Sequence, residues 1–563
     1  MRQLRIMPVA MNRLSLPATA LALLICAALP AAPQGQATEP VAEGTGPEPS
    51  EAIERAADVG PPTAPQVTVT RDALQPAPAL GRWRVDVAVP PEAAANPVTG
   101  PRVQGREAGF LRRWIREGSA AGLAGVFYDN RDNGHSRLDA RRFPQLTHIR
   151  YARELRSRDQ HRSLAHSMLF PGPVLGNASL AVTAGIYARS LPRLAMSSQQ
   201  GIAQAFVGYA HNHLYVYPAH RDVGGDAGDI LPAMVPYFAI SEGSSGTDRP
   251  VLDALAFALA SMRPDTRARL EAEGLLASTL TMLLRNGLSG TEGYLDPAAH
   301  PAAIHRRRLD TEAMMAAAHT MTPDEIPPLV VLRVLTEDFA EAAGLDGRSE
   351  RLFDTPSAVA RLWRNWEWTR SMVVSTAGTR DPNGRSLRIH WVLIAGDPER
   401  VRVVPLDADG RRARIEIDWH DAPFVSPRGG EAGARVELAA IAWNGAWFSA
   451  PAFVTVAFPA HQARVYSAGP DGAMRLSAID YDARRRDAAF DPQFWWEARW
   501  RDEPMLDPAS QRIGWRRHLR DGRMVEVPDT HPGSYSIRQR GHWPPRLQWS
   551  SVPGPEGSVV VVD

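Results

Sequence analysis

Carboxylates and an imidazole gather in the stretch YDNRDNGHSRLD at residues 128–139. They follow the short apolar run at 123–130, which predicts a strand, so we expect them at the carboxyl end of that strand. Ligands bind at this edge of open α/β sheets. Asp129, Asp132 and His135 are therefore candidate catalytic residues, because such groups act as acids, bases or metal ligands.

Asp129 and Asp132 are also candidate ligands of a divalent cation such as Ca²⁺. The EF-hand template does not fit, because Arg131 occupies its third position and Ala140 its twelfth. Two interpretations stay open: a looser cation site, and a hydrogen-bonded turn with an Asn-Gly pair at its corner.

Histidines recur in the stretch HNHLYVYPAHRD at residues 211–222. Because side chains alternate along a strand, His211 and His213 are predicted to share one face with Tyr215 and Tyr217. Two imidazoles separated by one strand residue can ligate one metal ion, such as Zn, so both are candidate metal ligands and catalytic residues. The ligand-binding candidates of this stretch are Asn212, Tyr215, His220 and Asp222. The alternative is an edge strand with one solvated face.

A serine pair lies between a predicted strand and a predicted helix in AISEGSSGTDRPVLDAL, residues 239–255. Ser244 and Ser245 are candidate nucleophiles, and Asp248 is a candidate ligand-binding residue. Backbone N–H groups at the start of such a helix also favour an anion. The nucleophile-elbow pattern G-x-S-x-G is not met, and a tight connection with ordinary N-capping is the alternative.

The N-terminal residues predict export. Arg13 precedes an apolar run at 14–32 that ends in small residues, which is typical of a cleaved secretory signal peptide over 1–32. Cys26 is the single cysteine, and Ile25 stands where lipoprotein acylation requires a small residue. We therefore expect a secreted or periplasmic protein without disulfides and without a membrane span after cleavage.

Strands and helices alternate in the first half of the chain. Residues 33–80 are rich in Pro and Ala and are predicted to be a disordered tether. Residues 81–345 are predicted to form an α/β main domain with some parallel sheet. Its strands are expected at 123–130, 146–152, 212–218 and 234–240, and its helices at 249–262, 267–287 and 310–321. Residues 346–368 are predicted to be a linker helix.

Strands alone follow from residue 369, at the spacing of a β-sandwich. Asp381-Pro382-Asn383-Gly384, the strand carrying Trp391 and the closing strand FVTVAF resemble a PKD-type immunoglobulin-like domain over 369–460. The whole chain likewise resembles secreted bacterial proteins that contain such domains, a likeness that implies no particular activity. Residues 461–563 are predicted to be a β-rich tail, whose tryptophans either stack on sugars or form a core.

Composition excludes several classes of protein. The 563 residues carry 62 acidic and 63 basic side chains, a balance that does not indicate a nucleic-acid partner. Every one of the basic side chains is arginine. This excludes a lysine Schiff base, a pyridoxal-phosphate enzyme and a P-loop lysine.

These features together predict a hydrolase that acts on an extracellular polymer or cell-envelope glycan, most simply a carbohydrate. A divalent metal, Ca or Zn, is the one cofactor that the residues suggest. The alternative is a non-catalytic surface or carbohydrate-binding protein with the sandwich as a spacer. The hydrolase hypothesis requires Asp129, His213 and Ser244 or Ser245 to surround one cleft.

The signal peptide can be tested directly. Protein exported by a bacterial host should begin between about residues 31 and 40, as measured by N-terminal sequencing. Recovery of the uncleaved chain from the cytoplasm would contradict export.

Overall fold

A computed structural model describes residues 65–131, 134–155, 168–178, 199–219, 233–244, 246–290, 292–344, 349–420, 424–425, 431–432, 435–459, 462–481, 500–509, 511–528, 549–554 and 557–562. The chain divides into two units, Met1–Ala52 and Ile53–Asp563. The predicted signal peptide lies outside the described residues, and everything below concerns the second unit. Among the described residues, no helix is long and apolar enough to cross a membrane.

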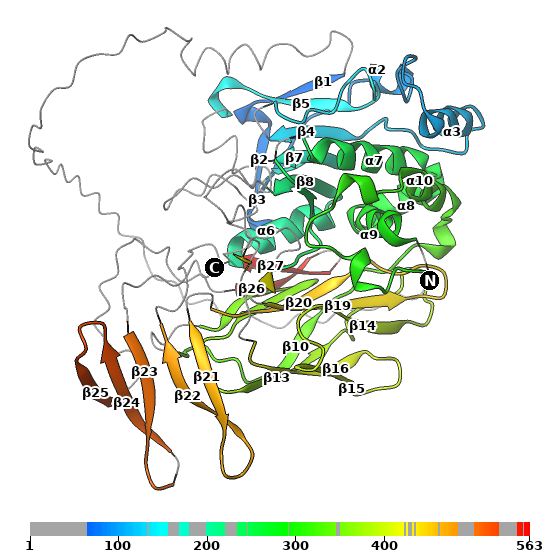
Figure 1. The fold of residues 1–563 in the computed structure, drawn as a ribbon. Helices are drawn as coiled ribbons and strands as arrows, with labels where there is room; N and C mark the ends of the chain where they lie inside the picture. The colour runs from blue at the N-terminus through cyan, green and yellow to red at the C-terminus, as the bar shows by residue number, and fades with distance from the viewer. Residues whose placement is uncertain are drawn as a thin grey trace, which may run out of the picture. The chain divides into compact units, whose positions relative to one another are not determined.

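A six-stranded parallel sheet forms the α/β part (Figure 1). Its strands, in spatial order, are β1 (Gln66–Val69), β5 (Thr147–Tyr151), β4 (Phe127–Arg131), β7 (Val174–Ala178), β8 (His213–Ala219) and β9 (Phe238–Glu242). Every neighbouring pair is parallel. The apolar runs predicted four of these strands correctly, because parallel strands are buried on both faces.

The direction of the chain reverses beside β4. After β4 the chain moves to β5 on one side, and it then returns past β4 to β7 on the other side and continues to β8 and β9. The carboxyl ends of β4 and β7 therefore form a topological switch point, which is where open α/β sheets bind ligands.

Helices pack beside the sheet: α2 (Glu92–Ala95), α3 (Arg106–Arg116), α6 (Gln199–Ala210), α7 (Asp248–Ser261), α8 (Pro264–Ala272), α9 (Leu276–Ser289) and α10 (Thr311–Thr320). Helix α7 contacts β7, β8 and β9, and α10 lies against both α7 and α9 (Figure 1). The single helix predicted over 267–287 is instead α8 and α9. Gly274 separates them at a φ of +67°, where a Cβ would lie 2.4 Å from the carbonyl oxygen of Ala210.

Two largely antiparallel sheets follow the helices. One contains β10 (Arg333–Glu337), β13 (Thr369–Ser375), β16 (Arg412–Asp418) and β15 (Val401–Pro405). The other contains β11 (Arg351–Thr355), β12 (Ala358–Leu362), β20 (Ala452–Ala457), β19 (Arg435–Trp443) and β14 (Arg388–Ala395). Side chains of both sheets form one buried core, around residues such as Met372, Ile415 and Val454.

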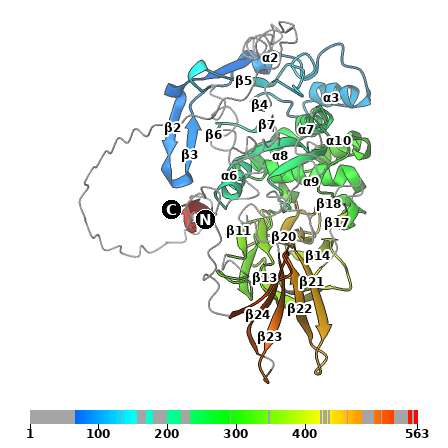
Figure 2. The ribbon, with the colours of Figure 1, turned by 60° about the vertical axis from the view of Figure 1, so that its left-hand side comes forward.

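The smaller sheets complete the described fold. One contains β2 (Leu74–Ala77), β3 (Arg82–Val85) and β6 (Met168–Leu169), and two hairpins are β17 (Phe424–Val425) with β18 (Glu431–Ala432) and β26 (Trp549–Gly554) with β27 (Gly557–Val562). The five-stranded meander near the C-terminus contains β21 (Ala463–Ala468), β22 (Met474–Asp480), β23 (Trp500–Leu506), β24 (Arg512–Leu519) and β25 (Met524–Pro528) (Figure 2). Its Trp515 is buried against Trp366, so this tryptophan is a core residue and not a platform for sugars.

Two predicted boundaries are wrong. Ordered structure begins before residue 81, because β1 pairs with β5 inside the stretch predicted to be a tether. The linker helix predicted at 346–368 is the hairpin β11–β12, whose strands meet around Pro356. Proline at this position ends a strand or makes a turn but interrupts a helix.

The residues that resemble a PKD-type domain form a turn and a strand. The Asp381 carboxylate accepts hydrogen bonds from the backbone N–H groups of Asn383 and Arg385, and Gly384 adopts a φ of +73°. Trp391 is half-buried in β14 and donates its indole N–H to the carbonyl of Gly410. The two sheets share a core, but the PKD identity remains a prediction.

The five-stranded sheet is buried on both faces. Phe353 of β11, Ile441 of β19 and Phe453 of β20 join the core of the α/β part. Leu438 and Val454 of the same sheet face the core shared with the four-stranded sheet. The predicted sandwich at 369–460 therefore lacks β10, β11 and β12 and covers only part of this structure.

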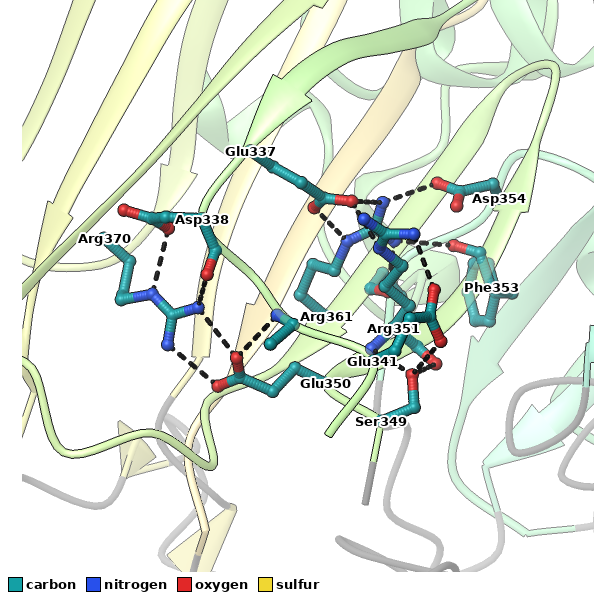
Figure 3. Close-up of polar contacts among 12 residues, drawn as sticks. Glu337, Asp338, Glu341, Ser349, Glu350, Arg351, Phe353, Asp354, Arg361 and Arg370 are labelled. Atoms are coloured by element: carbon teal, nitrogen blue, oxygen red, sulfur yellow. Dashed lines mark hydrogen bonds and ion pairs between the residues drawn. The ribbon is translucent and has the colours of Figure 1, made fainter. Parts of the chain in front are cut away.

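Buried ion pairs link the two sheets (Figure 3). Arg361 of β12 binds both carboxylate oxygens of Glu337 on β10. Arg370 of β13 binds both oxygens of Glu350, which directly precedes β11, and also contacts Asp338. The side chains of Arg370 and Glu350 are 1% and 0% exposed, so each charge depends on the other.

Breaking the Arg370–Glu350 pair should therefore be costly. We expect Glu350→Gln to lower the free energy of unfolding by up to about 3 kcal/mol, because it leaves the buried guanidinium with the half-exposed Asp338 as its one remaining carboxylate partner among the described residues. Replacing both residues, as in Arg370→Met with Glu350→Leu, should recover part of the loss. Urea denaturation measures both effects.

The matched control is Glu341→Gln, which removes a carboxylate that is 67% exposed and bound to Arg351. It should cost less than about 1 kcal/mol. Equal losses for Glu341→Gln and Glu350→Gln would show that burial does not set the strength of these pairs.

Candidate functional site

Two polar clusters lie at the carboxyl end of β4, one on each face of the sheet. Asp129 and Arg131 point to one face because they are two residues apart, and Tyr128 and Asn130 point to the other. This is the switch point of the sheet, as the sequence predicted for the stretch 128–139.

The first cluster is a buried ion pair surrounded by tyrosines. Arg131 Nε lies 2.8 Å from Asp129 Oδ2, and both side chains are fully buried. Tyr215 donates its hydroxyl to the same carboxylate oxygen at 2.8 Å. The Arg131 guanidinium also donates to the Tyr151 hydroxyl and lies over that ring.

Gly176 allows this arrangement. A Cβ on Gly176 would lie 2.4 Å from the Tyr215 ring, so the absence of a side chain lets this ring cross β7 to reach Asp129 on β4. Burial, followed by the charge of Asp129, raises the pKa of Tyr215 well above its ordinary value. The hydroxyl therefore stays protonated and keeps donating to the carboxylate.

The second cluster is centred on Asn177 at the end of β7. Its amide oxygen accepts a hydrogen bond from Tyr128 at 2.9 Å. Its amide nitrogen donates to Asp248 Oδ2 at 3.1 Å and to the carbonyl of His135 at 3.2 Å. Asn177 thus joins β4, β7, the loop after β4 and the first residue of α7.

Ser136 and the backbone of Gly246 close this cluster. The Gly246 N–H donates to Ser136 Oγ at 2.6 Å and lies 3.3 Å from Asp248 Oδ1. Asp248 is buried, and this burial raises the pKa of its carboxyl group, while hydrogen bonds to Ser136 and Asn177 act in the opposite direction. A buried carboxyl group that accepts hydrogen bonds from neutral donors can act as a general acid or base.

His213 lies at the amino end of its strand, away from the carboxyl ends of the strands where Asn177 and Asp248 lie. It is the first residue of β8 and pairs with Val174, the first residue of β7. Its Nε2 accepts a hydrogen bond from the Phe170 N–H, and its side chain is buried. The prediction that His213 shares a cleft with Ser244 is therefore wrong, because His213 begins β8 whereas Ser244 follows β9, whose last residue pairs with the far end of β8. Asp129 lies nearer, since Tyr215, two residues after His213, donates its hydroxyl to Asp129.

The other predicted residues of this stretch have structural contacts. His211 belongs to the turn after α6, where Nδ1 bonds to the carbonyl of Val207 at 2.7 Å, so it does not share a strand face with His213. Asn212 adopts a φ of +64° and its side chain links Glu271 of α8 to Leu276 of α9.

Ser244 lies in the connection between β9 and α7, where its carbonyl accepts a hydrogen bond from the Thr247 hydroxyl at 2.8 Å. This is the tight connection that the sequence offered as the alternative to a nucleophile elbow. Four further candidates lie outside the described residues: Asp132, His220, Asp222 and Ser245.

The described residues do not form a binding site for the expected divalent metal. No three of their His, Cys, Asp or Glu side chains gather where they could hold an ion. Asp129 is bound to Arg131, and His211 and His213 belong to the other edge of the sheet.

Sequence reasoning missed Asn177 and Ser136 as partners of Asp248. Asn177 follows the apolar run Val174–Leu175, the pattern that identified the end of β4. The signal was therefore present, but the run is short and precedes residues with no periodic pattern.

Comparisons with known proteins identify no family. No family model matches the chain, and no curated protein matches it. A nucleoside hydrolase-related hypothetical protein from Saccharophagus degradans, associated with carbohydrate metabolism, is similar over 51% of this chain and 72% of its own, at 11% identity and a TM-score of 0.18.

Two other solved structures show similarity to this chain. The SrpA adhesin from Streptococcus sanguinis matches at 12% identity over 31% of this chain and 89% of its own, with a TM-score of 0.14. The N-terminal Ig1-2 module of the Drosophila receptor protein tyrosine phosphatase DLAR matches at 9% identity over 36% and 98%, with a TM-score of 0.12. At TM-scores this low, none of the three assigns an activity to this chain.

His213 should affect stability through pH. Burial lowers its pKa from 6.5 to about 3, so below pH 6.5 the unfolded chain binds a proton that the folded chain does not. His213 therefore does not lower the free energy of unfolding above pH 6.5. Below that pH it lowers the free energy of unfolding by about 1.4 kcal/mol per pH unit as the pH drops toward 3.

We expect His213→Gln to remove this effect and flatten the loss of stability between pH 6 and 4, as measured by urea denaturation. His135→Gln changes an exposed histidine and is the control. If the two variants have the same pH dependence as the unmodified chain, His213 is not a neutral buried residue.

Proposed function

We propose that this protein is an exported hydrolase that acts on carbohydrate, with its active site at the carboxyl ends of β4 and β7. The observation that carries the proposal is the hydrogen bond between Asn177 and Asp248, 3.1 Å long. It brings a buried carboxyl group to the switch point of the parallel sheet, the position at which this architecture binds ligands.

Asp248 is the proposed general acid and base. Its raised pKa increases the share of the protonated form, which can donate a proton to the oxygen of a leaving group. In the ionised form the same carboxylate can take a proton from water. Asn177 and Ser136 are positioning residues that fix the carboxyl group from two sides.

The chemistry of the neighbouring groups favours a neutral polyol as substrate. The side chains that meet around Asp248 carry amides, hydroxyls and one phenol: Asn130, Ser136, Asn177 and Tyr128. Such groups both donate to and accept from the hydroxyl groups of a sugar. An extracellular polymer or a cell-envelope glycan is a substrate that an exported protein would meet.

The same hydrogen bonds support a second candidate, a non-catalytic carbohydrate-binding protein. Asn177 is buried and bonded to three neighbours, which is also how a rigid structural residue behaves. The two functions differ in one measurable respect, because only the hydrolase turns its substrate over.

The test compares Asp248→Asn with Asp253→Asn, both on α7. We expect the purified chain to release reducing sugar from a panel of plant and bacterial polysaccharides. Asp248→Asn should lower the rate about 100-fold or more while leaving binding to the same insoluble polysaccharide in place. Asp253 is partly buried against Arg142, and its variant should retain activity within a few-fold.

Binding without turnover in the unmodified chain would instead favour the carbohydrate-binding protein. Neither binding nor turnover across the panel would contradict both functions. Equal losses of activity in the two variants would show that Asp248 acts only through stability.

A further inference from the structure

Arg82, the first residue of β3, carries a buried charge to which no polar group of the described residues bonds. Its side chain is 4% exposed, and Nε, Nη1 and Nη2 are all buried without a hydrogen-bond partner. No other arginine among the described residues has all three guanidinium nitrogens in this state. Arg131 and Arg370, which are equally buried, each bind a carboxylate.

The amino-terminal edge of β8 lies close to Arg82. Strand β3 runs beside β2 and pairs with β6, where Trp83 lies opposite Met168 (Figure 2). Two residues after Met168, the Phe170 N–H donates to His213 Nε2. Arg82 is near enough for its charge to lower the pKa of His213, a smaller effect than the burial of that ring.

Among the described residues, no acidic group compensates the charge. Burial alone lowers the pKa of Arg82, to about 9, so the guanidinium remains protonated at neutral pH. Its five N–H donors then lack acceptors inside a low-dielectric environment. A buried cation without a partner is strongly destabilising, and proteins normally supply an anion to it.

We propose that Arg82 forms the centre of a binding site for an oxyanion, a carboxylate or a phosphate group. A guanidinium binds either group through two parallel N–H···O bonds, which would satisfy donors that are now unpaired. The ligand has to be an anion, because a metal cation would be repelled and a neutral sugar would leave the charge uncompensated.

This site is separate from the proposed active site. His213 begins β8, whereas Asn177 and Asp248 lie at the carboxyl edge of the sheet. The bound oxyanion would therefore not be at the position of hydrolysis. It would stabilise the contact between β3, β6 and the start of β8, and its binding does not depend on the proposed function.

The test is thermal unfolding of the full chain in chloride buffer at constant ionic strength. Sodium phosphate is titrated in one arm and sodium acetate in the other, which distinguishes the two oxyanions. We expect at least one of them to raise the Tm saturably, by about 2–4 °C or more at concentrations far above the Kd. The Arg82→Met variant should lose this shift.

Arg84→Met is the matched control, because Arg84 lies on the same strand and is exposed. It should keep the full shift. Arg82→Lys retains the charge but loses the planar fork, so it should bind at least about tenfold more weakly, and it decides the question if Arg82→Met does not fold.

The absence of a saturable shift with either anion in the unmodified chain would overturn the proposal. An unchanged shift in Arg82→Met, or an unchanged Kd in Arg82→Lys, would also overturn it. A direct readout is the imidazole NMR signal of His213, which the bound anion should displace in the unmodified chain and in Arg84→Met.

Discussion

The burial of the five-stranded sheet on both of its faces is the constraint on which the rest of this structure depends. A strand with one wet face can alternate apolar and polar residues, but β12, β19 and β20 are buried almost throughout. One face of this sheet completes the core of the α/β part, and the other completes the core shared with the four-stranded sheet. The sheet therefore belongs to both cores, and the two halves of the chain cannot be stabilised independently.

Pairing with arginine allows carboxylates to be buried beside these cores. A chain without lysine depends on arginine for its permanently charged basic contacts, and the planar guanidinium can bind a buried carboxylate through two hydrogen bonds. Arg361 and Arg370 use this geometry to connect two sheets, and Arg131 uses it to neutralise Asp129 inside the α/β part. Replacing a buried ion pair by apolar residues of similar volume is often neutral or stabilising, whereas removing one partner is costly.

Strands of the parallel sheet were predictable because their apolar runs are continuous and end in polar residues. The same reasoning located the stretch after β4 and the start of α7 at one edge. It failed for His213 because the alternation of side chains assigns a residue to one face of a strand but does not give its distance from the carboxyl end. The bounds of β8 place this histidine as the first residue of the strand, at its amino end.

Other features could not be read from local sequence. The stretch RLFDTPSAVARLW has apolar residues that fit either a helix face or a hairpin, and pairing with β20 selects the hairpin. The four residues of β1 carry too little pattern to stand out from a Pro- and Ala-rich stretch, and their partner β5 lies far along the chain. In both cases a distant strand supplies the deciding hydrogen bonds, which no short window contains.

The parallel pairing of β12 with β20 has a consequence for how the chain folds. Ala358 pairs with Phe453, and the N–H of Met234 donates to the Thr455 hydroxyl. The five-stranded sheet is therefore completed by β20, the last of its strands to be synthesised. Long-range pairings of this kind delay folding, since loop closure must precede the contacts that compensate it. The nascent chain would therefore lack the strand that joins β12 to β19 until β20 has emerged.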